Sequence, residues 1–202
     1  MKHVPTNPPR EHGAALLEVL VTILLVAFGL LGLAGLISRS YIGEIEATQR
    51  AQALMLIQDM IGRIESNRRN ASLYFTASAV GGSTQNCSAI VITSSATLVT
   101  RDLCDWGNLI AGANERIGGT TTAVLPGASG CVIANDLDTL AAETTGLAVA
   151  VAWQANTPTV APNAATYAAL ACGSGVLPDE RYRRVVTMPV NIGSLSASAV
   201  AP

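Results

Sequence analysis

Lysine and histidine are almost missing from this chain of 202 residues. The only lysine is Lys2 and the only histidines are His3 and His12, so neither residue type occurs after position 12. Histidine is the usual general base and the commonest metal ligand, and lysine supplies the amine of a Schiff base. Most catalytic and metal-binding hypotheses depend on these groups, so we expect no enzymatic activity, no metal and no cofactor.

Aromatic and charged residues are also scarce. Aromatics make up 4% of the chain and charged residues 13%, and the formal net charge of −2 gives no reason to expect nucleic-acid binding. Alanine, glycine, serine and threonine are abundant, a composition that suits a small extracellular β-rich domain better than a cytosolic enzyme. The length leaves room for one such domain and a long helix.

A long apolar run stands near the beginning of the chain. Thr22 is the only polar residue between Val19 and Ile37, and residues 14–17 are apolar as well. The run is long enough to cross a bilayer as a helix. Glu18 interrupts it, and a carboxylate at mid-membrane costs on the order of 2.5–3.5 kcal/mol. Glu18 is therefore a candidate functional residue; the alternative is an idle carboxylate at the level of the lipid headgroups.

The residues around Glu18 resemble the cleavage signature of type IV prepilins and of type II secretion pseudopilins. In that family a short polar leader ends in glycine, prepilin peptidase cuts after it on the cytoplasmic face, and the new amino terminus is N-methylated. The resemblance implies a leader over residues 1–13 that ends at Gly13. It makes Ala14 the methylated first residue, where the family commonly has Phe or Met, and Glu18 the family's fifth-position glutamate.

Electrostatics gives Glu18 a role in assembly. Cleavage after Gly13 places an ammonium group at a helix N-terminus within lipid, where the helix dipole already contributes positive charge. A carboxylate from a neighbouring subunit neutralises that ammonium, so the charge that penalises an isolated subunit favours an assembled one. We expect the helix to serve both as an anchor and as an assembly device.

Ordinary secretion is the rival interpretation of the same segment. Residues 32–34 form a small-x-small site for signal peptidase, and cleavage there would release a secreted protein beginning at Gly35. The apolar run is longer than a usual signal core, and the helical pattern continues beyond it. Both features favour the prepilin interpretation.

The helical pattern continues past the apolar run with an amphipathic character. Ile57, Ile61 and Ile64 recur at helical intervals, and no proline occurs between Glu11 and Pro126. We predict one helix with a transmembrane half over residues 14–37 and an amphipathic half over residues 38–70. Three glycines on one face of the transmembrane half indicate either close helix packing or tolerated glycine, and they mark where we expect the helix to unwind. These glycines are Gly29, Gly32 and Gly35.

The remaining residues, 71–202, are predicted to form a β-rich globular domain. A short helix is expected from Thr100, with Trp106 in the core. The predicted strands cover residues 121–125, 131–134, 146–154 and 184–192, separated by turn-forming residues. Large and small residues alternate from Leu147 to Trp153, as in a strand with one face on the long helix. Short strands after one long helix predict an α+β fold with an antiparallel sheet.

Four cysteines lie beyond the apolar run. An even number on the translocated side indicates two disulfides, whereas a metal site would need closer spacing. Three connectivities are open, and adjacency along the chain favours the pairs 87–104 and 131–172. The cysteines are Cys87, Cys104, Cys131 and Cys172.

Scattered segments narrow the resemblance to the PilV-type minor pilins, also called type IV pilus modification proteins. These segments include residues 28–36, residues 58–68, Leu125-Pro126-Gly127 and Val151-Ala152-Trp153. This similarity implies a type IV pilin fold and a single-pass protein of the bacterial inner membrane, with its C-terminal domain in the periplasm and later in the pilus. The implied partners are prepilin peptidase, the assembly platform, the major pilin and other minor pilins.

Two other functions remain open at the level of sequence. One is a minor pseudopilin of a type II secretion system, which shares the same signature. The other is a membrane-anchored periplasmic hydrolase, for which Asp136, Asp138 or the Asp179-Glu180 pair would supply the carboxylates. These acids lie in segments typical of loops, where surface charge is the simpler interpretation.

Overall fold

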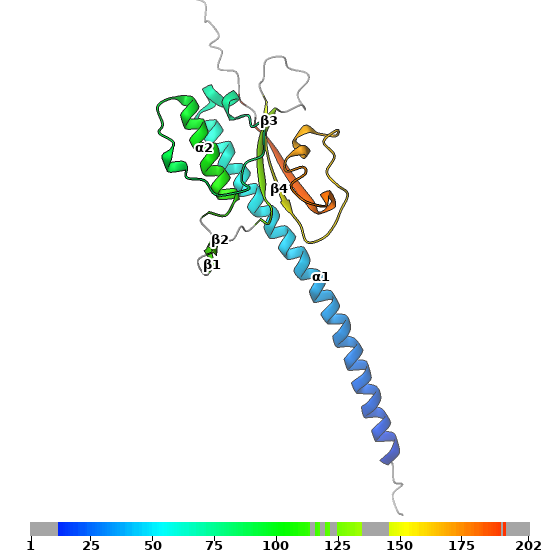
Figure 1. The fold of residues 1–202 in the computed structure, drawn as a ribbon. Coiled ribbons are helices and arrows are strands. Elements are labelled where there is room, and N and C mark those ends of the chain that lie inside the picture. The colour runs from blue at the N-terminus through cyan, green and yellow to red at the C-terminus, as the bar shows by residue number, and fades with distance from the viewer. Residues whose placement is uncertain are drawn as a thin grey trace, which may run out of the picture. The chain divides into compact units, whose positions relative to one another are not determined.

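A long helix and a small antiparallel sheet are the main elements of the described structure, together with a shorter helix (Figure 1). This computed structural model describes residues 12–113, 116–117, 120–121, 125–134, 146–190 and 192. The chain divides into two compact units, Met1–Ile45 and Glu46–Pro202. Only the beginning of helix α1 (His12–Ser66) is described in the first unit. The second unit contains the rest of α1 and every other element, so the predicted α+β layout is confirmed.

Helix α1 differs from its prediction in two places. The glycine-containing stretch around Gly32 is helical without interruption, so the expected unwinding is wrong. Each glycine weakens a helix by only about 1 kcal/mol, and the backbone hydrogen bonds persist through the stretch. The helix also ends at Ser66 instead of residue 70, because Asn67 has φ −119° and ψ 37°. The 3₁₀ helix η1 (Arg68–Tyr74) follows directly.

Helix α2 (Ser95–Ile110) begins five residues before the predicted start at Thr100. The reason is a capping box. The N–H of Thr97 donates to Oγ of Ser94, and the N–H of Ser94 donates to Oγ1 of Thr97. These bonds satisfy free donors at the helix start and bring residues 95–99, the last part of a stretch rich in valine, isoleucine and threonine, into the helix. A short 3₁₀ helix, η2 (Cys87–Ala89), precedes α2.

The main sheet has three antiparallel strands in the order β3 (Ser129–Ala134), β4 (Leu147–Gln154) and β5 (Arg183–Val190). Each of these strands begins and ends within two residues of a predicted strand. The fourth predicted strand, at 121–125, can be compared with the structure only at its two ends. Thr121 pairs within a separate two-stranded sheet of β1 (Arg116–Ile117) and β2 (Thr120–Thr121), Leu125 lies in a bend, and 122–124 fall outside the described residues.

The central strand β4 packs one face against the long helix, as expected, and its other face is buried as well. Its large side chains belong to one core cluster, together with residues of α1 and α2, whereas Ala148 and Ala150 belong to a second cluster. The alternation of large and small residues therefore reflects the space on each face of the sheet. Large side chains fill the space between β4 and the helices, whereas only alanine fits between β4 and the segment packed on its other face.

The first core cluster is built on a stripe of α1 within the second unit. Ala53, Ile57, Met60 and Ile64 recur every three or four residues and are fully buried. Trp106 is also fully buried, as predicted, and its Nε1–H donates to the carbonyl oxygen of Leu56 at 2.8 Å. This bond ties α2 to α1 and satisfies the only polar atom of the Trp106 side chain.

The second core cluster surrounds a disulfide on the other face of the sheet. Cys131 on β3 bonds to Cys172, which follows the 3₁₀ helix η3 (Ala168–Ala171), and both pack with Ala148 and Ala150. The other disulfide joins Cys87 to Cys104. The four cysteines are thus paired as adjacency along the chain favours, and the 41-residue separation of Cys131 and Cys172 fixes a loop-rich segment against the sheet.

Gly130 on β3 lies directly against two side chains of α2. A Cβ at this position would lie 2.4 Å from the ring of Trp106 and 2.4 Å from Cδ1 of Ile110. We expect Gly130→Ala to lower the free energy of unfolding by about 1–3 kcal/mol, because neither neighbour is free to retreat. Denaturant unfolding followed by tryptophan fluorescence measures the loss.

Gly62 provides the matched control for this substitution. It lies on α1, and a Cβ there would meet nothing within 4 Å. Gly62→Ala should leave stability unchanged or raise it by up to about 1 kcal/mol through helix propensity. Equal stabilities for the two variants would show that α2 has room to move away from β3.

Candidate membrane and assembly segment

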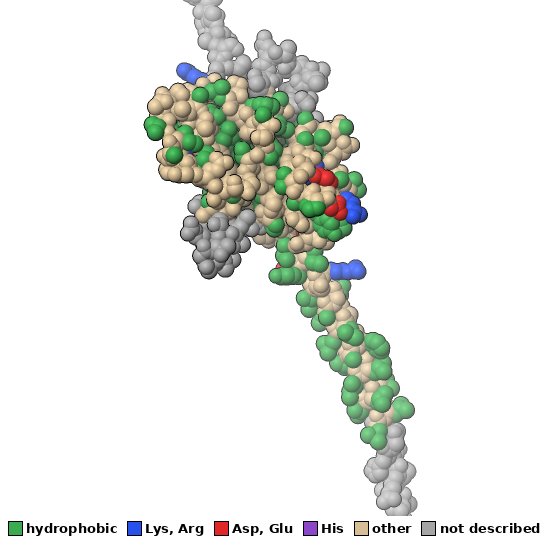
Figure 2. Space-filling view, viewed as in Figure 1, with side chains coloured by type: hydrophobic (Ala, Val, Ile, Leu, Met, Phe, Trp, Pro, Cys, Tyr) green, Lys and Arg blue, Asp and Glu red, His purple; other side chains and the backbone are tan. Residues whose placement is uncertain are grey.

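Residues 16–37 of the first unit form an exposed apolar helix surface. The large apolar side chains from Leu16 to Ile37 are 44–75% exposed. Figure 2 shows hydrophobic side chains along this part of α1. By length and composition, α1 qualifies as a membrane-crossing helix. Such a continuous apolar surface is unfavourable in water, so it needs lipid or protein to cover it.

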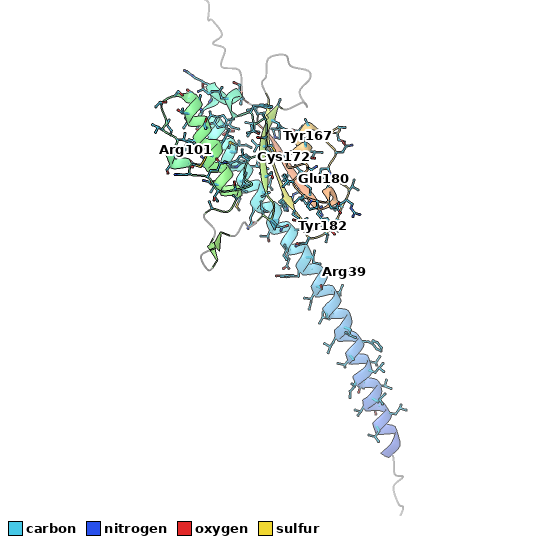
Figure 3. All side chains as sticks on the ribbon, viewed as in Figure 1. Arg39, Arg101, Tyr167, Cys172, Glu180 and Tyr182 are labelled. Carbon is cyan, nitrogen blue, oxygen red and sulfur yellow. A yellow bond between two sulfur atoms is a disulfide. The ribbon has the colours of Figure 1, made fainter. Side chains whose placement is uncertain are left out.

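The polar groups of this segment are few. The Thr22 hydroxyl donates to the carbonyl oxygen of Val19 at 2.8 Å, so its hydrogen is satisfied inside the helix. Such internal pairing removes much of the cost of placing a hydroxyl in lipid. The first cation after the run is Arg39, labelled in Figure 3. Its position after Ile37 places a charge at the end of the apolar run.

The residues of the predicted processing site lie at the start of α1. Gly13 and Ala14 have helical backbone, and Glu18 lies four residues after Ala14, one helical turn further along. The Glu18 side chain is exposed, and it forms no ion pair with any other described residue. Cleavage after Gly13, methylation of Ala14 and the assembly role of Glu18 stay predictions.

The Asp179-Glu180 pair, considered above as a hydrolytic group, is held in place by arginines. Hydrogen bonds from Arg181 lower the pKa of Asp179. Burial works against ionisation of Glu180, but the N–H of Gly175 and the guanidinium of Arg183 outweigh it and lower the pKa. Both groups stay ionised, whereas a carboxylic acid that donates a proton near neutral pH needs a raised pKa.

Arg183 explains why these acids lie here. Its side chain is only 3% exposed, its Nε pairs with Glu180, and its Nη1 donates to the carbonyl oxygens of Leu170 and Cys172 at 2.6 and 2.9 Å. Figure 3 labels Glu180 and Cys172 beside β5. The ion pair between Glu180 and Arg183 therefore holds the segment before β5 against the sheet. Asp136 and Asp138, the other hydrolytic candidates, lie outside the described residues.

A polar network joins the end of α1 to α2. The Tyr74 hydroxyl donates to Oδ2 of Asp102 at 2.6 Å, and Nη1 of Arg63 donates to Oδ1 of the same carboxylate at 3.2 Å. Burial and the nearby Asp102 raise the pKa of Tyr74 to about 12. The tyrosine is therefore neutral at physiological pH. The network holds α2 and η1 in position. Because Tyr74 is protonated at physiological pH, it does not supply the phenolate that a general base would require.

Sequence reasoning missed a hollow of about 300 Å³ in the second unit. It lies between the part of α1 that begins at Glu46, the end of β4 and the start of β5, and its lining includes Arg50, Trp153 and Arg184. Arg50 is more than 100 positions from Trp153 and from Arg184 in the sequence. No local pattern in the sequence indicated this hollow.

Comparisons with family models, with curated proteins and with solved structures found no match to this chain.

Proposed function

We propose that this chain is a minor pilin of a type IV pilus, a non-enzymatic subunit that enters the filament through α1 and takes part in initiating or modifying it. The observation that carries the proposal is a single acid, Glu18, five residues after Gly13 at the head of an exposed apolar helix. An anchor alone has no use for that acid. A subunit whose neighbours present buried ammonium groups does.

The arrangement of the second unit supports the proposal. The amphipathic part of α1 packs its apolar stripe on an antiparallel sheet, as a pilin fold requires, and two disulfides suit a translocated domain. In this proposal prepilin peptidase processes the chain at the inner membrane, with the second unit in the periplasm. The assembly platform then passes it into a filament with the major pilin and other minor pilins.

The test begins with the mass of the mature protein. Mass spectrometry of the full chain from its native cells should show loss of residues 1–13 and a methyl group on Ala14. Gly13→Val should stay uncut in the membrane, because the peptidase requires the glycine. A mature N-terminus at Gly35 would instead establish ordinary secretion and would overturn the proposal.

Fractionation separates the pilin from the pseudopilin. For a minor pilin, the processed chain should be found with pilus subunits in sheared filaments. Recovery with type II secretion components in place of pilus subunits would assign it to the pseudopilins, which share the processing signature. Recovery with neither set of proteins would contradict the proposal and favour a membrane-anchored periplasmic protein.

A further inference from the structure

The hollow beside Glu46 carries a charge imbalance. Three charged side chains line it, namely Glu46 and Arg50 on α1 and Arg184 on β5. Two are cations and one is an anion, so the hollow has one positive charge in excess. Trp153, Val185 and Val186 supply an apolar wall next to these charges.

The single carboxylate of the hollow is already engaged. The Thr157 hydroxyl donates to Oε1 of Glu46, and Nη2 of Arg184 lies 3.6 Å from the same oxygen. Arg184 is itself held by the carbonyl oxygen of Thr157 at 2.8 Å and by Oγ1 of Thr159 at 2.7 Å. Glu46 is therefore turned toward the loop after β4, away from its own helix.

Arg50 loses its natural partner as a result. A glutamate four residues before an arginine is the favourable spacing for an ion pair within a helix, and Glu46 and Arg50 have that spacing. Within the described part of the chain, however, Arg50 makes no ion pair or hydrogen bond, and its side chain is exposed. The hollow thus combines an unpaired guanidinium with an indole and aliphatic wall.

We propose that this hollow receives an acidic side chain, followed by an apolar one, from a neighbouring subunit of the filament. The occupant is defined by charge complementarity, because a carboxylate on Arg50 balances the excess cation. A volume of about 300 Å³ is at the lower limit for small-molecule sites and suits one or two side chains. The proposal rests on the proposed function for the identity of the partner, but binding at the hollow is testable without a pilus.

The first experiment measures binding by the full-length chain in detergent. N-acetylglutamyl-leucinamide is titrated and tryptophan fluorescence is followed, since Trp153 lines the hollow. We expect a saturable change in fluorescence, with binding about two- to fivefold weaker for Arg50→Ala, as for an exposed ion pair. Arg68→Ala is the matched control, because Arg68 is exposed and lies on η1, outside the hollow. The proposal would be overturned if N-acetylglutaminyl-leucinamide bound as tightly as the glutamyl peptide, or if Arg50→Ala bound the glutamyl peptide with wild-type affinity.

The second experiment measures incorporation in cells. Arg50→Glu should be processed normally yet enter filaments less well, whereas Arg50→Lys and Arg68→Glu should enter at the normal level. Normal incorporation of Arg50→Glu would overturn docking of a subunit at the hollow, even where the peptide binds. Absence of the wild-type chain from filaments would overturn the proposed function and the filament partner with it, while the peptide titration decides separately on binding of a carboxylate.

Discussion

Glu18→Ala should yield a processed membrane protein that enters filaments at a level roughly tenfold or more below wild type. Removing the carboxylate makes the apolar segment more hydrophobic, so insertion is unimpaired or improved. The bond between Gly13 and Ala14 is untouched, so cleavage persists. What is lost is the partner for a neighbouring chain's ammonium group, which then stays buried and unpaired, a defect of several kcal/mol when fully desolvated.

Comparison of sheared-filament and membrane fractions measures this effect. Glu65→Ala is the matched control, because it removes the same charge from an exposed position on the same helix, beyond the apolar run. Glu18→Asp keeps the charge on a shorter side chain and should recover part of the incorporation. Incorporation of Glu18→Ala at the wild-type level would show that Glu18 is not an assembly residue and would leave α1 as an anchor only.

Removing the Cys131–Cys172 disulfide should destabilise the second unit by about 4 kcal/mol, against about 3 kcal/mol for Cys87–Cys104. These values follow from the entropy of closing loops with sequence separations of 41 and 17 residues. Packing widens the difference, because Cys131 and Cys172 lie in a buried cluster with Ala148 and Ala150, where truncation also leaves a cavity. Cys104, in contrast, is only half-buried.

Denaturant unfolding of the paired cysteine-to-alanine variants tests the order. The full-length chains are compared in detergent, with tryptophan fluorescence as the signal, because Trp106 and Trp153 are buried in the second unit. An equal or larger loss for the Cys87 and Cys104 variant would contradict the loop argument. Alkylation of all four cysteines in the native, unreduced protein would show that neither disulfide is formed.

Some of the fold was predictable because one local pattern settled it. The apolar run from Val19 to Ile37 specifies a helix that needs no tertiary partner, and isoleucines at helical spacing extend it to Ser66. Strands β3, β4 and β5 were found through turn residues at their ends and β-branched residues within them. The start of α2 was missed because the Val, Ile and Thr content of residues 89–100 outweighed the capping signal of Ser94 and Thr97.

The candidate site divides in the same way. Gly13, Ala14 and Glu18 are candidates because of their spacing along one segment, so sequence alone was enough to propose them. The burial of Arg183 and the lining of the hollow at Arg50 depend on residues that the fold brings together from separate segments. No local sequence pattern predicts such contacts. The same limit applies to β4, whose second buried face becomes apparent only when Cys131 and Cys172 are placed over it.

The sequence by itself determined the apolar helix, its one acid and the favoured cysteine pairing, because periodicity, spacing and order along the chain are local properties. Only the tertiary structure decided which charges are paired. Glu46 turns toward Thr157 and Arg184, Arg50 remains without a partner among the described residues, and Arg183 is buried on Glu180 and two carbonyl oxygens. The physical reason is that an ion pair depends on the distance and solvation of two groups in space, which separation along the chain does not specify.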